Sequence, residues 1–438
     1  MRIFIPFCSG NRFILWMRRC RILRHRYRRI SDRIRIGGAT DCDNVTRIMS
    51  DSNFLEWPFF DDTHRRLAAE LETWVEAHRH TLEAEVVDEA QAVRNIVRLL
   101  GEGGWLRYVL PAALGGPHAR VDVRSLCVVR DVLARYSGLA DCTFAMQGLG
   151  AVPMVLFGTA AQQAAHLPRI ANGSCITGFC LSETEAGSDV SALQTSARHE
   201  GSDGDSYILN GRKTWISNAG VADTYIVFAR TGEAPGAKGL SAFVVDAETP
   251  GLSVPQTIQV VAPHVIGNVA FENCRVLASC MLGQPGEGFK VAMATLDVMR
   301  STVGAAALGF ARRALSEARA HVKARKVFGQ ALAQFQATQM RIADMALDVE
   351  TSALLVYRAA WTKDTLRDRV TLEASMAKLH ATEAAQRVID SAVQLLGGLG
   401  VTVGSTVERL YREIRPLRIY EGTSEIQKLI IAGQVLGK

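Results

Sequence analysis

The 438-residue sequence contains no run of about 18 apolar residues, the length that a membrane-spanning helix requires. This absence predicts that no segment crosses a membrane and that the protein has no membrane partner. None of the nine cysteines is paired at the spacing of a zinc site; the nearest pairs are Cys175 with Cys180 and Cys274 with Cys280. We therefore expect no metal site, and scattered cysteines in an otherwise ordinary chain favour a reducing compartment.

Lysine is absent from the first 48 residues, which hold twelve arginines and three aspartates and so carry a net charge of +9. Because the whole chain carries +6, residues 49–438 carry −3. The body of the chain therefore lacks the basic surface that nucleic-acid-binding proteins use. We expect no nucleic-acid partner.

The Arg-rich, acid-poor segment 1–48 has two interpretations. It is a disordered or untranslated extension upstream of the true start at Met49, after which the sequence is ordinary (MSDSNFLEWPFFDD). Alternatively it is a mitochondrial presequence, although these usually contain more serine. The low serine content favours the first interpretation. The expected location is the cytoplasm for a bacterial protein, or the mitochondrial matrix if the presequence is real.

Apolar periodicity divides the remaining chain into three parts. Residues 49–174 place apolar side chains three and four apart, as in HRRLAAELETWVEAH, which predicts a helical domain. Residues 175–285 contain short β-branched and aromatic runs such as DTYIVFAR, separated by Gly, Asn and Asp, which predict a β domain. Residues 286–438 return to long helical periods, and 288–329 could form one very long helix. Three long helices and a short last one predict a bundle.

Two motifs belong to the β domain. FCLSETEAGSDVSALQT (179–195) ends a predicted strand in small residues whose backbone N–H groups suit phosphate or flavin oxygens, although a plain turn would look the same. GRKTWISNAG (211–220) places Trp215 and Ser217 on one side of a strand, where a half-buried core tryptophan is the alternative.

Three further motifs lie in the C-terminal part. In RKVFGQALAQFQ, Arg325 and Phe328 share a face if the segment is helical, and Gln336 follows; a helix terminator is the alternative. QLLGGLG (394–400) fits a helix C-cap. In RIYEGTSEIQ (418–427), Glu421 precedes a predicted helix, with a capping box from Ser424 to Gln427. On this motif alone, a carboxylate that complements a helix N-terminus is the simpler interpretation.

Taken together and in this order, the five motifs resemble the acyl-CoA dehydrogenase family over about 380 residues, from near Asp61 to the C-terminus. The resemblance implies a mostly α fold with an N-terminal helical domain, a β-barrel-like middle domain and a C-terminal four-helix bundle. It also implies FAD as cofactor, bound between the last two domains and reaching into a neighbouring subunit of a homotetramer.

The same resemblance implies site residues. The residues expected to bind FAD are Phe179, Leu181, Ser182, Gly187, Ser188, Trp215, Ser217, Arg325, Phe328, Gln336, Gln394, Gly398, Thr423 and Glu425. Those expected to contact the acyl-CoA are Ser188, Asp297, Arg300, Tyr420 and Gly422. Glu421 occupies the position of the catalytic base. Other members carry this glutamate at the position of Met299, which cannot accept a proton.

Two stretches depart from the family pattern. Thr184 and Glu185 replace Pro and Gly in the loop SETEAGSD, which puts a charge near the expected phosphates. The stretch VVAPHVIGNVAFENCRV lacks the usual GSDTRG-like run, so substrate placement follows less directly from the resemblance than cofactor placement.

The function expected from the resemblance is α,β-dehydrogenation of an acyl-CoA to the trans-2-enoyl-CoA, in fatty-acid or carboxylic-acid catabolism. Glu421 would remove the α-proton, hydride would pass to flavin N5, and an electron-transfer flavoprotein would accept the electrons. An oxygen-using acyl-CoA oxidase is the first alternative. A DNA-associated flavoprotein is the second, but the only basic segment is 1–48.

Overall fold

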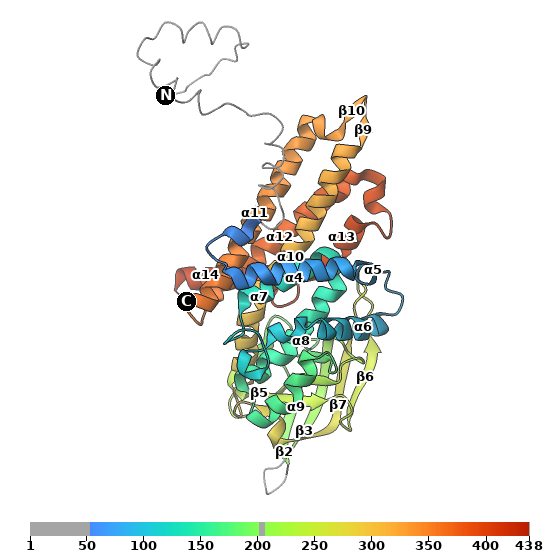
Figure 1. The fold of residues 1–438 in the computed structure, drawn as a ribbon. Helices are drawn as coiled ribbons and strands as arrows, with labels where there is room; N and C mark the ends of the chain where they lie inside the picture. Colours follow the sequence, from blue (N-terminus) through green and yellow to red (C-terminus); the bar gives the residue numbers. More distant parts are fainter. Residues whose placement is uncertain (1–52, 201–205, 438) are drawn as a thin grey trace, which may run out of the picture. The chain divides into compact units, whose positions relative to one another are not determined.

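Helices precede and follow a single block of strands in the computed structural model, which describes residues 53–200 and 206–437 (Figure 1). The Arg-rich segment 1–48 and Met49 lie outside the described residues. Residues 57–438 form one structural unit, and the short 3₁₀ helix η1 (Asn53–Glu56) belongs to a separate N-terminal unit.

The main unit begins with six α-helices, and all but the second start at a side-chain cap. They are α4 (Asp62–Ala77), α5 (Arg79–Leu82), α6 (Glu89–Glu102), α7 (Val123–Tyr136), α8 (Gly138–Phe157) and α9 (Ala160–Ala171), with 3₁₀ turns η2 (Trp105–Val109) and η3 (Ala112–Leu114) between α6 and α7. Asp61, Asp88, Asp122, Ser137 and Thr159 each accept a backbone N–H from the first turn that follows them. Such caps satisfy N–H groups that have no partner inside the helix.

The middle of the chain forms one sheet of eight strands. They are β1 (Thr177–Cys180), β2 (Ser196–Glu200), β3 (Ser206–Ser217), β4 (Thr224–Arg230), β5 (Leu240–Asp246), β6 (Leu252–Thr257), β7 (Ile266–Leu277) and β8 (Met281–Leu282). The strand path is β6-β7-β3-β2-β4-β5-β8, and β1 pairs in parallel with β4. Among the described strands β6 and β8 do not pair, so the path stays open. The 3₁₀ turns η4 (Val190–Ala192), η5 (Gly236–Gly239) and η6 (Ala278–Cys280) join strands.

Long helices make up the C-terminal part. They are α10 (Gly288–Ala324), α11 (Gln336–Thr365) and α12 (Thr371–Leu396), followed by α13 (Thr406–Leu417) and α14 (Ser424–Leu436). The hairpin β9 (Lys326–Val327) and β10 (Gln330–Ala331), then η7 (Leu332–Gln334), join α10 to α11; η8 (Gly397–Val401) follows α12. The middle of α10 is buried on every face, because α7, α8, α11 and α12 all pack against it.

Helix α8 connects the sheet to α10. Gln147 donates from Nε2 to the Cys175 carbonyl (2.7 Å) and accepts from the Thr177 N–H (3.0 Å), which fixes α8 against β1. On another face of the same helix, a Cβ at Gly148 would come within 2.7 Å of the Met299 methyl group. Glycine at this position lets the Met299 side chain pack directly on the α8 backbone, and a larger residue would displace it.

Two helices, α8 and α10, are long and apolar enough to cross a membrane by length and composition alone. In both, 83% of the apolar window is buried inside the protein. Core helices of folded domains pass the same test, so these two helices are weak evidence for a membrane span.

The predicted order of helices, strands and helices is observed, but the helix predicted over 288–329 is too long. It ends at Ala324, because Arg325 is extended (ψ 124°) and Phe328 and Gly329 both have positive φ (48° and 84°) in the turn between β9 and β10. Arg325 and Phe328 consequently do not share a helix face.

Candidate active site

The segment between α13 and α14 presents Glu421 in an uncommon backbone conformation. Glu421 has φ +53° and Gly422 φ +90°. A Cβ at Gly422 would lie 2.5 Å from Gln427 Nε2, so only glycine fits. Gln427 Nε2 donates to the carbonyls of Glu421 (3.1 Å) and Gly422 (3.0 Å), and Lys378 Nζ donates to the Gly422 carbonyl (2.8 Å). These contacts hold a left-handed turn that a non-glycine residue adopts only when its surroundings impose it.

The predicted capping box from Ser424 to Gln427 is wrong. The N-cap of α14 is Thr423, whose Oγ1 accepts the Ile426 N–H (3.4 Å). Ser424 instead donates to Glu383, and Gln427 turns back to the two carbonyls. The cap lies one residue earlier because the Gln427 side chain is used to hold the Glu421 turn.

Three buried cations surround the Glu421 carboxylate. Burial raises its pKa, whereas Arg130, Arg300 and Lys378 lower it, and Asp141 raises it further. The net pKa shift is upward. Oε2 of Glu421 is buried and accepts no hydrogen bond from any described residue. A desolvated carboxylate with a raised pKa and no donor on one oxygen is suited to accept a proton.

Each of the three cations is held differently. Arg130 donates from Nε and a terminal nitrogen to the two oxygens of Asp141 (2.7 and 2.8 Å) and from the other terminal nitrogen to Thr302 Oγ1 (2.9 Å). Arg300 has a buried Nε with no partner among the described residues, and burial lowers its pKa. Burial also lowers the pKa of Lys378, to about 8.

Helix α10 provides no competing base. Met299 is fully buried against Gly148, so the alternative position carries an apolar side chain that fills the space between α8 and α10. Asp297, one of the predicted substrate residues, is engaged by Lys363 Nζ (3.3 Å). Glu421 is therefore the carboxylate at this site that retains an oxygen without a partner.

A bare aromatic face lies on β3. Trp215 has φ +60° and is 61% exposed, and the β3–β7 register shifts between Lys213 and Ile216. The bulge interrupts the alternation that we expected for Trp215 and Ser217, and it turns the indole outward rather than into the core. Phe179, at the end of β1, packs edge-on against Phe228 (5.0 Å).

The two residues that depart from the family pattern form the tip of a turn. Glu183 and Ala186 exchange backbone hydrogen bonds (3.1 and 3.2 Å), which leaves Thr184 and Glu185 exposed at the tip. Glu183 accepts from Lys213 Nζ (2.7 Å) and from two backbone N–H groups, so the base of the loop is fixed. Leu181 and Ser182 precede this turn and are half-buried; Gly187 and Ser188 follow it and are exposed.

The remaining predicted flavin residues lie elsewhere in the chain. Arg325, Phe328, Gln336, Gln394 and Gly398 are all exposed, and Phe328 is 97% exposed. Figure 1 places the β9–β10 hairpin, next to Arg325 and Gln336, at the ends of α10 and α11 remote from the sheet. A single chain therefore does not bring this set to Trp215. Thr423 and exposed Glu425 begin α14, beside Glu421.

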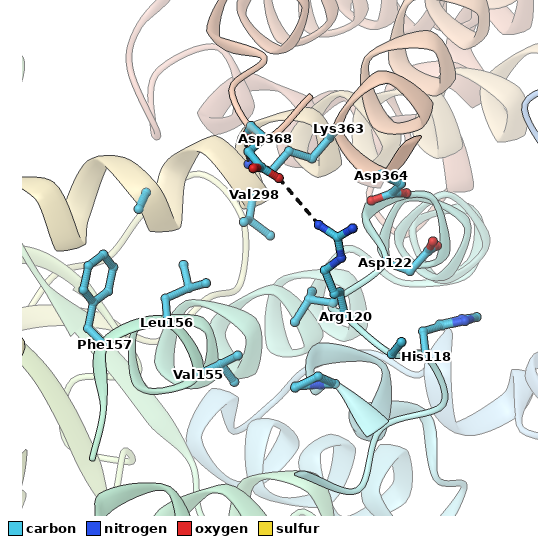
Figure 2. A pocket seen from close by; sticks show the side chains of 14 residues that line it. His118, Arg120, Asp122, Val155, Leu156, Phe157, Val298, Lys363, Asp364 and Asp368 are labelled. Atoms are coloured by element: carbon cyan, nitrogen blue, oxygen red, sulfur yellow. Dashed lines mark hydrogen bonds and ion pairs between the residues drawn. The ribbon is translucent and has the colours of Figure 1, made fainter. Parts of the chain in front are cut away.

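A cleft of about 630 Å³ opens on another side of α10 (Figure 2). It is lined by α10 at Ala294 and Val298, by the end of α8, and by charged side chains that include the Arg120–Asp368 ion pair (3.6 Å). None of its lining residues is a predicted catalytic, flavin or substrate residue. Asp364 in this cleft accepts the backbone N–H groups at the start of α7.

Sequence profiles of one family cover almost all of residues 61–436. The acyl-CoA dehydrogenase N-terminal domain matches residues 61–174, the middle domain matches 178–274, and the C-terminal domain matches 286–436. The chain belongs to the acyl-CoA dehydrogenase family. It is an FAD-dependent enzyme of that class, as its relatives show.

Two curated relatives illustrate the family. The human mitochondrial short-chain specific acyl-CoA dehydrogenase is 39% identical over 380 residues, which is 86% of this chain and 90% of the relative. The 3-(aryl)acrylate reductase of Clostridium sporogenes is 36% identical over 381 residues, 86% of this chain and all of the relative.

Solved structures agree with the fold. Butyryl-CoA dehydrogenase of Megasphaera elsdenii superposes with a TM-score of 0.80 at 33% identity, covering 86% of this chain and 99% of that chain. A chain from work on the electron transferring flavoprotein of Acidaminococcus fermentans gives 0.79 at 34% identity with the same coverage. A glutaryl-CoA dehydrogenase of Mycobacterium smegmatis in complex with FADH2 gives 0.78 at 27% identity, covering 87% and 96%. The predicted fold class and cofactor are confirmed.

The residues of this acyl-CoA dehydrogenase fit FAD. Trp215 projects an exposed ring from a strained backbone position, and strain of that kind is retained where a ligand uses it. A Cβ placed at Gly187, in the loop whose Ser182 carbonyl accepts the Thr214 N–H next to Trp215 (3.0 Å), would meet nothing within 4 Å, so the backbone there faces open space. Exposed glycine backbone and a flat aromatic face together match a cofactor with phosphates and a fused ring system.

Sequence reasoning missed four residues that the structure places around Glu421: Arg130, Asp141, Lys378 and Gln427. The first three are buried charges inside α7, α8 and α12, where a single charge has no periodic signal. It also missed a buried pair between His264 Nε2 and Glu413 Oε2 (2.6 Å), in the stretch that lacks the family's usual run. There His264 links the loop after β6 to α13.

Proposed function

We propose that this enzyme oxidises a short-chain acyl-CoA to the trans-2-enoyl-CoA with Glu421 as the base. The observation that carries the proposal is the state of Glu421: the side chain is half-buried, its pKa is raised, and its buried Oε2 accepts no hydrogen bond from any described residue. Met299 leaves α10 without a carboxylate at the other base position.

The proton step uses residues of this chain. The α-carbon of the thioester lies against Glu421, whose carboxylate accepts the α-proton as charge develops on the thioester oxygen. The N–H of Glu421 donates to no described residue and is free to stabilise that oxygen. Arg130, Arg300 and Lys378 favour the ionised carboxylate and so oppose the effect of burial on the pKa of Glu421.

The β-hydrogen leaves on the side of β3. Trp215 and Ser217 present the face against which the flavin ring packs, with Phe179, Leu181 and Ser182 at its edge and Gly187 and Ser188 toward its phosphates. When bound, FAD supplies the two-electron acceptor for the hydride from the β-carbon. Exclusion of water from this buried region strengthens every charge interaction around the base.

Short acyl groups are favoured by the relatives. The human relative is named for short-chain acyl-CoA, and the Megasphaera elsdenii relative for butyryl-CoA. The Clostridium sporogenes relative, named as an acrylate reductase, supports a second candidate in which a protonated Glu421 returns a proton to Cα in the reverse reaction. Burial raises the pKa of Glu421, which favours the protonated form that this reverse reaction needs.

The proposed electron acceptor is an electron-transfer flavoprotein. Its support is the similarity to a chain from work on such a flavoprotein. Direct use of oxygen is the alternative, and rates of reoxidation of the reduced enzyme by air and by an electron-transfer flavoprotein distinguish the two.

The proposed assembly is a homotetramer that completes each flavin site with residues of a neighbour. Met340, Leu347 and Leu354 recur every seven residues on one face of α11 and are all exposed. Exposed apolar stripes of this kind mark subunit contacts. The exposed position of Arg325 and Phe328, remote from Trp215, supports a role in a neighbouring subunit's site.

The test is anaerobic bleaching of the yellow holoenzyme by acyl-CoAs with two to twelve carbons; separately, enzyme reduced with dithionite is offered aryl acrylates and 2-enoyl-CoAs. We expect rapid bleaching by butanoyl-CoA and none in Glu421→Gln. Bleaching by no acyl-CoA, together with reoxidation by an acrylate, would replace the first candidate with the second. Equal bleaching in Glu421→Gln would remove Glu421 from the base role.

A further inference from the structure

A fully buried ion pair lies beside the proposed base, and the chemistry described so far gives it no direct part. Arg130 of α7 and Asp141 of α8 are joined by two short hydrogen bonds, and both are almost completely inaccessible to solvent. Arg130 also donates to Thr302, one turn beyond Met299 on α10. The pair thus joins the three helices that pack around the base.

The same pair adjoins Tyr420 and Glu421. Arg130 and Asp141 are among the charges that act on both side chains, and Cys142 is among those acting on Tyr420. Tyr420 is 37% exposed, and burial raises its pKa. Thr302, which accepts from Arg130, donates in turn to the Met299 carbonyl (2.6 Å), so hydrogen bonds connect the pair to the turn of α10 that carries Met299.

The direction of the acyl group follows from the proposed function, on which this step rests. The α-carbon lies against Glu421 and the β-carbon faces Trp215. Asp297 and Lys363 are partly exposed to solvent, so the CoA part of the substrate leaves the protein beside them. Any carbon beyond the β-carbon must continue past Tyr420 toward α7 and α8. There it meets Met299, packed on Gly148, and then the ion pair.

We propose that the Arg130–Asp141 pair, braced by Thr302 and flanked by Met299, is the end wall that restricts this enzyme to short acyl groups. Each of the three guanidinium nitrogens of Arg130 donates to a protein acceptor, which uses three of its five N–H groups and holds the guanidinium in place. An apolar tail pushed against it would displace charge-assisted hydrogen bonds that cannot re-form with a hydrocarbon. Met299 alone could yield, because methionine is flexible, whereas the bidentate pair is rigid.

The physical expectation is a sharp loss of preference with chain length. In an apolar pocket each added methylene raises affinity about fourfold. At the end wall this gain in affinity per methylene should disappear after the first few carbons. The kcat/KM of the wild type should therefore fall about tenfold or more from butanoyl-CoA to octanoyl-CoA. Replacing a buried ion pair by apolar residues of similar volume often preserves the fold, whereas removing one partner does not.

The experiment measures kcat/KM for butanoyl-, hexanoyl- and octanoyl-CoA in the FAD-loaded wild type and the double variant Arg130→Met with Asp141→Leu. The octanoyl-to-butanoyl ratio cancels any common change in the basicity of Glu421. We expect that ratio to rise at least tenfold in the double variant. The control, Arg313→Met with Glu83→Leu, removes a partly buried pair elsewhere on α10 (2.7 Å) and should leave the ratio unchanged.

Met299→Ala keeps the ion pair and provides a second variant should the double variant not fold. It should move the preference by one or two carbons and still exclude octanoyl-CoA. A wild type that turns over octanoyl-CoA as well as butanoyl-CoA, or an unchanged ratio in the folded double variant, overturns the end wall alone. Absence of bleaching by every acyl-CoA overturns the proposed function and this inference with it.

Discussion

Lys378 offers a test of how the structure sets the basicity of Glu421. Its ammonium group is buried, donates to the Gly422 carbonyl (2.8 Å), and is one of three cations that lower the pKa of Glu421. Lys378→Met removes that charge, so the pKa of Glu421 should rise. Two unit charges in contact interact by about 4 kcal/mol at an effective dielectric constant of about 20. Lys378 contacts the carbonyl of Gly422 rather than the Glu421 carboxylate, so we take roughly a third of that energy. This corresponds to an increase of about one unit in the pKa of Glu421.

The assay is the pH dependence of flavin bleaching by a saturating acyl-CoA, followed by stopped flow. The acidic limb should move upward by about one pH unit in Lys378→Met, so the rate at any pH on that limb falls several-fold. Since the pKa of Lys378 is about 8, the wild type loses the same charge above that pH, and the two profiles should converge there. Lys378→Arg retains charge and donor and should keep the wild-type limb. A parallel loss at every pH in Lys378→Met would mean that Lys378 only supports the backbone.

Three further outcomes are expected. Glu421→Gln should fold, stay yellow and lose turnover by about 10² to 10⁴ or more, as removal of a general base does; near-normal turnover would exclude the assignment. Arg325→Ala should weaken FAD retention and oligomer formation together, because charge-assisted donors to a diphosphate are lost. Flavin absorbance and light scattering measure the two effects, and Lys326→Ala is the neighbouring control. A wild-type holoenzyme that is monomeric would contradict the shared site. The pKa of Lys378 is about 8 in the folded protein and about 10.4 in the unfolded chain, so between these pH values unfolding takes up a proton. The stability of the wild type relative to Lys378→Met should therefore rise with pH from about 8 to 10. A difference in denaturant midpoint that does not change with pH would contradict a lowered pKa for this buried lysine.

Much of the fold follows from local sequence patterns. Helical periodicity locates the two helical parts, and β-branched runs locate the strands, because both patterns record which face of an element is buried. The carboxylate before α14 is recognisable as well, since Glu421 stands between an aromatic residue and a glycine just ahead of a capping threonine.

Two local errors have a common cause in backbone conformation. The segment after Ala324 continues a helical composition, yet Phe328 and Gly329 adopt positive φ and reverse the chain. Trp215 likewise breaks the strand alternation at positive φ. A non-glycine residue at positive φ is unusual, so neither phenylalanine nor tryptophan indicates it from sequence. Tertiary context overrides the local preference at both places.

The charged surroundings of Glu421 could not be found from sequence for a different reason. Arg130 and Asp141 are eleven residues apart across the break between α7 and α8, and their third partner, Thr302, is 172 residues from Arg130. No period relates these positions. Each stands where a helical pattern calls for an apolar residue, so the sequence shows only two isolated charges. Their pairing exists because the helices cross there.

The arrangement of donors explains how a carboxylate can be both fixed and basic. A hydrogen bond to an ionised carboxylate stabilises it and weakens it as a base. Lys378 and Gln427 donate instead to the backbone carbonyls of Glu421 and Gly422, so the turn is held while Oε2 receives no hydrogen bond from any described residue. Burial then raises the pKa of Glu421, and the nearby cations limit that rise. Lys378 contributes to position through its hydrogen bond to the Gly422 carbonyl and to basicity through its charge, so Lys378→Arg should keep both effects and Lys378→Met should remove both.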